Sequence, residues 1–382
     1  MFEADETCQT TEKRGGFVMR YRKMWLALGA SLVLLVSVSF STVSMGAEKP
    51  FAKGKRIRLI IPFSPGGGTD VYGRVVARHI GRYIPGNPTV IVQNMPGAGG
   101  TIAFNFLHHS AKPDGLTLGV SSSGTLTRQQ LGYKGARYDL AKMPIISVAG
   151  FSIITYVGAH VGVTSLEELL KKKLPRPLVR GDTSRESSTA MRRAVVFEAI
   201  LKQIPSKQIY GYPGYADVTA AIQRGEADIS GMSPPGFNAT VRPLVQEGKA
   251  FVLYHSGLLD AGGNIIRDPA AAEYPTFEEE YRKIFGKSPS GIAWEAFKSL
   301  VVSGGNFEKG LFAPPGTPKA TINVLASAVG KMLKDPKYVA DATRIFGAPI
   351  KTFVGADAQG ILDRAMKAPP EVQAFLKKLL KG

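Results

Sequence analysis

Cysteine and histidine are scarce in this sequence, and the common catalytic motifs are missing. The 382 residues include one cysteine, Cys8, and five histidines. No H-E-x-x-H pattern occurs and no carboxylate stands at ligand spacing from a histidine, so we expect no metal site. The sequence also has no G-x-S-x-G nucleophile elbow, no Walker sequence and no G-x-G-x-x-G fingerprint. We therefore expect no catalytic residue, no disulfide framework and no resident cofactor.

Acidic residues are outnumbered by basic ones, 30 to 48, which gives a formal net charge of +18. Such a chain attracts anions at long range. The positive charges are scattered, and the run of three lysines at residues 171–173 is typical of a solvated helix end. Because no aromatic stacking platform or zinc module accompanies them, we do not expect a nucleic-acid partner.

The N-terminal region has the order of a secretory signal peptide. A basic cluster at residues 20–23 precedes an apolar run at 24–40, and small residues follow at 44–47. This order predicts cleavage after Gly46 or Ala47. An uncleaved membrane anchor is the alternative, but the run is short for a bilayer span and contains serines.

Met19 is the translation start that the signal-peptide interpretation favours. Residues 1–18 carry four acidic side chains where a signal peptide needs a basic segment. We therefore expect residues 1–47 to be a leader and signal peptide that is removed, and the mature protein to lie in the periplasm.

Strands and helices alternate at the start of the expected mature chain. Residues 57–61, 89–92 and 116–120 have strand composition, and apolar residues recur at helical spacing over 71–80 and 102–107. Such alternation predicts a parallel sheet with right-handed crossovers.

A second alternating series runs over residues 152–256, and a more helical tail follows it. No low-complexity linker separates the two α/β blocks, so we expect strands that cross between two domains and a cleft at the crossing. The strands of the second block are expected near 177–180, 208–212, 228–231 and 251–254, and the helices of the tail near 276–285, 319–334, 338–346 and 372–381.

The glycine-rich loop at residues 65–70 is the strongest functional signal. It lies between a predicted strand and a helix start, where backbone N–H groups and the helix dipole receive a carboxylate well. Thr69 or Asp70 could cap the helix, and a tight turn with a cap is the alternative interpretation. For Gly67 we expect that no bulky side chain is tolerated, because a Cβ would obstruct either the turn or the approach of the ligand.

Three further polar or glycine-rich loops follow strand ends, at residues 96–100, 121–125 and 181–188. Ligands of open α/β sheets bind beyond the carboxyl ends of the strands. We therefore expect these loops to converge with the loop at 65–70.

The order of these motifs resembles the substrate-binding proteins of tripartite tricarboxylate transporters. The resemblance covers roughly residues 55–355 and implies an α/β, two-domain periplasmic-binding-protein (Venus-flytrap) fold with a ligand cleft between the domains. It implies a first domain of residues 48–152 plus 258–382 and a second domain of residues 153–257. The motifs that carry it are residues 60–70 with Arg74, residues 92–100, 113–118 and 225–228, and residues 311–318.

The resemblance implies a non-enzymatic, monomeric solute-binding protein that delivers a small carboxylate to membrane transporter subunits. The ligand could be a di- or tricarboxylate, an aromatic acid or an acidic amino acid. One alternative is the same fold presenting its ligand to a membrane sensor kinase, and another is a secreted enzyme with a glycine-rich anion-binding loop. The ligand-binding residues implied are Phe63, Gly66, Gly67, Gly68, Thr69, Asp70, Ser122, Ser123, Thr125, Thr183, Ser184 and Arg185.

The chain departs from the family pattern where ligand identity is set. The loop at 181–188 lacks the usual Gly-x-Gly-Ser with its following histidine, and residues 286–310 are longer than usual. Arg185 is one such departure. It could meet a second ligand carboxylate, or it could form a surface ion pair with Glu186 or Asp182.

Overall fold

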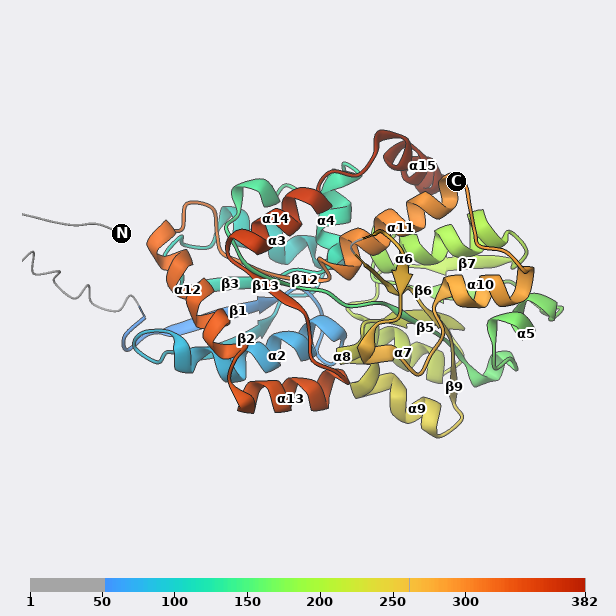
Figure 1. The fold of residues 1–382 in the computed structure, drawn as a ribbon, viewed down its shortest axis with the longest axis horizontal. Coiled ribbons are helices and arrows are strands. Elements are labelled where there is room, and N and C mark those ends of the chain that lie inside the picture. The colour runs from blue at the N-terminus through green and yellow to red at the C-terminus, as the bar shows by residue number, and fades with distance from the viewer. Residues whose placement is uncertain (1–51, 261, 382) are drawn as a thin grey trace, which may run out of the picture. The chain divides into compact units, whose positions relative to one another are not determined.

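The computed structural model describes residues 52–260 and 262–381, so the predicted signal peptide and the start at Met19 lie outside the described residues. Residues 50–382 form one compact unit. It contains two mixed sheets, and each is covered by helices on both faces (Figure 1). We call each sheet with its helices a lobe.

The first lobe is built on a sheet with the strand order β13-β4-β12-β3-β1-β2. Strand β1 pairs in parallel with β2 and β3, whereas β12 runs antiparallel to β3 and β4. Its strands β3, β4 and β12 are buried along their whole length, as central strands covered on both faces must be. The strands are β1 (Arg56–Ile61), β2 (Thr89–Asn94), β3 (Thr117–Val120), β4 (Ile145–Ala149), β12 (Lys309–Phe312) and β13 (Thr352–Val354).

Helices cover both faces of this sheet. Helices α2, α12 and α13 pack on one face around Val75, Leu325 and Phe346. Helices α3, α4 and α14 pack on the other face around Phe104 and Leu362. Their bounds are α2 (Gly68–Ile80), α3 (Thr101–His109), α4 (Ser123–Gln130), α12 (Lys319–Met332), α13 (Pro336–Phe346) and α14 (Ala356–Ala365).

The second lobe has the strand order β7-β6-β8-β5-β9. Strand β6 is parallel to β7 and β8, and β5 is antiparallel to β8 and β9. The strands are β5 (Ile154–Gly158), β6 (Leu178–Gly181), β7 (Ser206–Ile209), β8 (Ile229–Met232) and β9 (Ala250–His255). The α-helices of this lobe within the described residues are α5 (Leu166–Lys171), α6 (Ser188–Ala194), α7 (Tyr215–Gln223), α8 (Pro234–Gly236), α9 (Arg242–Gln246), α10 (Phe277–Phe285), α11 (Ile292–Gly305) and α15 (Pro370–Lys381). A small antiparallel hairpin is formed by β10 (Leu258–Leu259) and β11 (Ile265–Ile266).

Part of the C-terminal region packs on the second lobe. Phe277 of α10, Phe297 of α11 and Leu376 of α15 share one core with Leu178 and Val196. Judged by the packing of their side chains, α10 and α11 belong to the second lobe. The chain therefore re-enters the first lobe at β12, whereas the expected boundary was residue 258.

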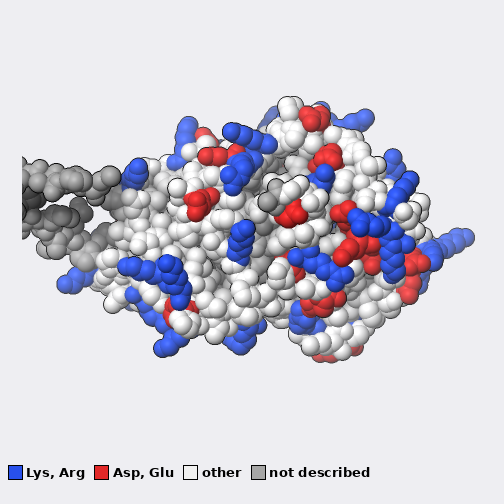
Figure 2. All heavy atoms as spheres, in the orientation of Figure 1, with Lys and Arg blue, Asp and Glu red and all other residues white. Residues whose placement is uncertain are grey.

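The surface carries charges of both signs. Figure 2 shows basic and acidic side chains interspersed over the face in view, with no continuous basic stripe. Among the described residues, no helix has the length and apolarity that a membrane span requires.

Candidate functional site

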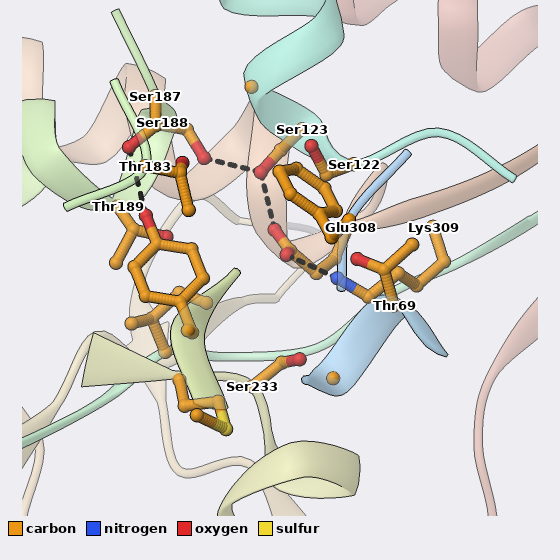
Figure 3. Close-up of a pocket in the computed structure, with 16 residues that line it drawn as sticks. Thr69, Ser122, Ser123, Thr183, Ser187, Ser188, Thr189, Ser233, Glu308 and Lys309 are labelled. Carbon is orange, nitrogen blue, oxygen red and sulfur yellow. Dashed lines mark hydrogen bonds and ion pairs between the residues drawn. The ribbon is translucent and has the colours of Figure 1, made fainter. Parts of the chain in front are cut away.

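The loops that follow β1, β3, β6 and β8 meet between the two sheets and enclose a small cavity (Figure 3). Its volume is about 30 Å³. The cavity is lined by Phe63, Gly68 and Thr69 after β1, by Ser122, Ser123 and Gly124 after β3, by Thr183, Ser187, Ser188 and Thr189 after β6, by Met232 and Ser233 at β8, and by Ile153, Tyr215, Glu308 and Lys309.

The residues expected at the site fall into two groups. Half of them line the cavity, namely Phe63, Gly68, Thr69, Ser122, Ser123 and Thr183. The others do not line the cavity, although they lie in the same loops or in the first turn of the helix that follows: Gly66, Gly67, Asp70, Thr125, Ser184 and Arg185.

Asp70 stabilises the glycine-rich loop through hydrogen bonds and is not the N-cap of helix α2. The N-cap of α2 is Gly67, so the expected cap at Thr69 or Asp70 is wrong. Asp70 is 2% exposed, and its carboxylate accepts hydrogen bonds from the backbone N–H of Gly66 at 2.9 Å, Arg74 Nε at 2.8 Å and Asn94 Nδ2 at 2.8 Å. These bonds fix the loop in the shape that brings Thr69 to the cavity.

The turn at Gly67 has space for a Cβ, whereas a Cβ on Gly68 would displace the Ser233 hydroxyl and one on Gly236 would meet backbone. A Cβ on Gly67 would lie 3.7 Å from its nearest neighbour, the backbone nitrogen of Tyr215, which is an ordinary contact. On Gly68 it would lie 2.2 Å from Ser233 Oγ, and on Gly236 it would lie 2.4 Å from the backbone nitrogen of Gly68. The start of α2 in the first lobe thus packs backbone to backbone on α8 of the second lobe.

Gly236→Ala is expected to lower the free energy of unfolding by about 1–3 kcal/mol, because its Cβ must push α8 away from α2. Urea unfolding measures the change. Gly330→Ala in α12 is the matched control, since a Cβ there meets nothing within 4 Å and alanine favours the helix. Equal stability of the two variants would refute the close packing of the lobes at this point.

Glu308 and Lys309 place a buried ion pair in the cavity wall (Figure 3). Glu308 Oε1 accepts from Lys309 Nζ at 2.8 Å, and Oε2 accepts from Ser123 Oγ at 2.5 Å. Arg192 Nη2 lies 3.6 Å from the same Oε2, and all three charged side chains are at most 4% exposed. Two buried cations therefore share a single carboxylate, which leaves one positive charge beside the cavity.

Arg192 keeps hydrogen-bonding capacity for an anion. Its Nε and Nη1 atoms are buried and have no hydrogen-bond partner among the described residues. Burial lowers the pKa of the Arg192 guanidinium, although the nearby Glu308 opposes this shift. Ser188, one helical turn before Arg192, shares a hydrogen bond with Ser123 across the lobes. Hydroxyl and guanidinium donors from both lobes thus converge on one point.

A second buried ion pair supports the loop after β6. Asp182 is fully buried and pairs with Arg193 of α6, and it also accepts from Tyr215 Oη at 3.1 Å. The Tyr215 hydroxyl shares a further hydrogen bond of 2.9 Å with Ser187 Oγ. Burial raises the pKa of Tyr215, so the phenol stays protonated and can donate. These contacts hold Thr183 and Ser187 against the cavity.

Arg185 is exposed and lies away from this cavity. It borders a separate hollow together with Arg180, Glu198 and Tyr210. Within the described part of the chain, no ion pair joins Arg185 to Glu186 or Asp182 either.

Sequence reasoning missed Glu308, Lys309 and Arg192. Charged residues are expected at the surface unless they are paired, and nothing in their spacing shows that they meet. The one available signal was the unusual length of residues 286–310, which end at this pair. Over residues 52–260 and 262–381, no cluster of three or more His, Cys, Asp or Glu could hold a metal ion.

Comparison with known proteins agrees with this architecture. Residues 74–253 match the family profile described as tripartite tricarboxylate transporter family receptor. A UPF0065 protein of Bordetella pertussis is 26% identical over 317 residues, which cover 81% of this chain and 84% of that protein.

Solved structures share the fold. The periplasmic binding protein BugD aligns with a TM-score of 0.66 at 19% identity, covering 85% of this chain and 97% of its own. Two Rhodopseudomonas palustris proteins align over 85% of this chain at 20% identity. MatC, described with bound malate, has a TM-score of 0.63 over 98% of its length, and Rpa4515, described with adipate, has 0.65 over 97%. Over residues 74–253 the chain is thus similar to the receptor family of the tripartite tricarboxylate transporters, and it has the α/β fold of a periplasmic binding protein.

Proposed function

We propose that this protein captures a small carboxylate between its two lobes in the periplasm and delivers it to the membrane subunits of a tripartite transporter. The observation that carries the proposal is the charge of the cavity wall. Arg192 and Lys309 are buried beside a cavity of hydroxyl groups, and Glu308 is the one carboxylate of the described residues that forms an ion pair with them. A ligand carboxylate neutralises the remaining positive charge.

The hydroxyl groups supply the hydrogen bonds that a carboxylate needs. Ser122, Ser123 and Thr69 approach from the first lobe, and Thr183 and Ser188 from the second. The Thr183 hydroxyl is buried and has no hydrogen-bond partner among the described residues, so it is free to donate to a ligand. Because both lobes contribute donors, the ligand stabilises the closed arrangement.

The second group of expected residues acts through loop shape. Gly66, Gly67 and Asp70 fix the glycine-rich loop, while Thr125 lies in the first turn of α4 and Ser184 in the loop after β6, beside the cavity serines. The related proteins that are described with malate and adipate bind acids of the same general class. We further propose that the signal peptide directs the chain to the periplasm, that the mature protein acts as a monomer and that it performs no catalysis.

A thermal-shift screen tests the proposed function. The panel contains malate, adipate, citrate, benzoate and glutamate, and each acid is compared with its uncharged amide. A ligand that binds only the folded state raises Tm by mass action, by the equivalent of about 2.7 kcal/mol at a hundredfold excess over Kd. We expect at least one acid to raise Tm and its amide to have no effect. A panel in which no carboxylate raises Tm more than its amide would overturn the proposal.

A further inference from the structure

Arg128 is a buried guanidinium that has no carboxylate partner. It lies on α4 and is 0% exposed. Its Nη2 donates to Ser184 Oγ at 2.7 Å, whereas Nε and Nη1 have no hydrogen-bond partner in the described part of the chain. No aspartate or glutamate of the described residues forms an ion pair with it. Two of its donor atoms are thus available to a ligand.

The guanidinium lies between the lobes and beside the cavity wall. A Cβ built on Gly124, which lines the cavity, would lie 3.3 Å from Arg128 Nη1. A Cβ built on Gly99 would lie 2.0 Å from Arg128 Nη2 and 2.7 Å from Ser184 Oγ. Gly99 has a φ of 62°, and its lack of a side chain lets the guanidinium lie against the loop at residues 96–100. This is the expected glycine-rich loop that does not line the cavity itself.

An unpaired buried guanidinium is costly for a folded protein. Removing a charge from water is strongly unfavourable unless an opposite charge and hydrogen bonds replace the water. Burial accordingly lowers the pKa of Arg128, and the charge of Glu186, which forms no ion pair with Arg128 in the described part of the chain, opposes this shift only in part. The neighbouring phenol of Tyr138 cannot supply the counter-charge, because burial raises its pKa to about 12. The structure therefore retains a cation that would be better compensated by an anion from outside the chain.

We propose that Arg128 receives the second carboxylate of a dicarboxylate ligand whose first carboxylate lies at Ser123 and Arg192. The inference rests on the proposed function and names its substrate class. A guanidinium suits the role because its planar fork donates two parallel hydrogen bonds to one carboxylate. Arg128 thus takes the part that the sequence suggested for Arg185.

The proposal places two cationic centres at the two ends of one ligand. Arg192 and Lys309 mark the first end and Arg128 marks the second, and Gly124 lies beside both the cavity and the second centre. Ser123 contacts Ser188 and Arg128 contacts Ser184 across the lobes, so a ligand at this point enters when the lobes separate and is held when they close again around it. Ser184, which bonds Arg128 across the lobes, then exchanges this contact for the ligand.

Calorimetric titration of the Arg128→Met chain with matched acids tests the proposal. The probes are malonate, succinate, glutarate and adipate, each beside the monoacid of the same chain length. We expect the variant to weaken the best dicarboxylate by about a hundredfold and the matching monoacid by less than about threefold. Arg128→Lys keeps the charge without the fork, so its dicarboxylate affinity should lie between those of Arg128→Met and the wild type.

The melting temperature without ligand separates a ligand-binding role from a structural one. Replacing an uncompensated buried charge by an apolar side chain of similar length is expected to raise Tm, whereas loss of a structural residue lowers it. Arg137→Met, at an exposed position, is the matched control and should change neither quantity.

The possible failures are distinguishable. If the wild type binds both classes of acid and Arg128→Met weakens them equally, Arg128 is not the second carboxylate site although the proposed function stands. If no acid of either class binds the wild type, the proposed function fails and this inference fails with it.

Discussion

Asp182→Asn is expected to lower the free energy of unfolding by about 3–5 kcal/mol. Asp182 is 0% exposed and its partner Arg193 is 1% exposed, so neither charge can turn to water. Asparagine keeps an oxygen that can accept from Tyr215, but it removes the negative charge and leaves the Arg193 guanidinium buried without a counter-charge. Urea unfolding of the ligand-free protein measures the loss.

A surface ion pair provides the control for this prediction. Arg224 and Glu226 are 58% and 54% exposed, and Glu226→Gln should cost less than about 1 kcal/mol. Combining Asp182→Asn with Arg193→Met removes both charges and should restore much of the stability. A loss below about 1 kcal/mol for Asp182→Asn alone would show that the pair does not hold the loop after β6.

The alternation of strands and helices could be predicted from the sequence where the strands are short, β-branched and bounded by turns. Strands β1, β2 and β3 lie where their composition places them. Strands β4 and β12, next to which the chain passes from one lobe to the other, were not predicted from the sequence. Their apolar residues are interrupted by serine in β4 and by lysine and glycine in β12. Packing of α10, α11 and α15 on the second lobe was also missed, since helical periodicity shows that a face is buried but not against which sheet.

The candidate site was predictable where backbone geometry defines it. The glycine-rich loop after β1 and the serines after β3 reach the cavity because strand ends in α/β sheets converge. The charged residues were not predictable. Arg128 and Arg192 stand on helices among polar neighbours, and local sequence does not distinguish a guanidinium in solvent from one buried between lobes. Glu308 and Lys309 line the cavity because they lie at the start of β12, where the chain passes from the second lobe into the first.

Glu308→Gln is expected to destabilise the ligand-free protein and to tighten carboxylate binding. Glu308 holds Lys309 and the Ser123 hydroxyl through its two oxygens and faces Arg192. Glutamine keeps the shape but leaves two buried cations uncompensated, which should cost about 3–5 kcal/mol. A ligand carboxylate then meets no competing negative charge and supplies the counter-charge that the variant lacks. The same acid should therefore raise Tm more in the variant than in the wild type.

Thermal unfolding and calorimetry of Glu308→Gln with the tightest-binding acid of the panel measure both effects. Glu295→Gln is the matched control, because Glu295 is 55% exposed and pairs with Lys298 on the surface of α11. It should change Tm and affinity little. Weaker binding by Glu308→Gln, with Glu295→Gln unchanged, would contradict the prediction. It would mean that Glu308 accepts a hydrogen bond from the ligand, which would then carry an ammonium or hydroxyl group beside its carboxylate.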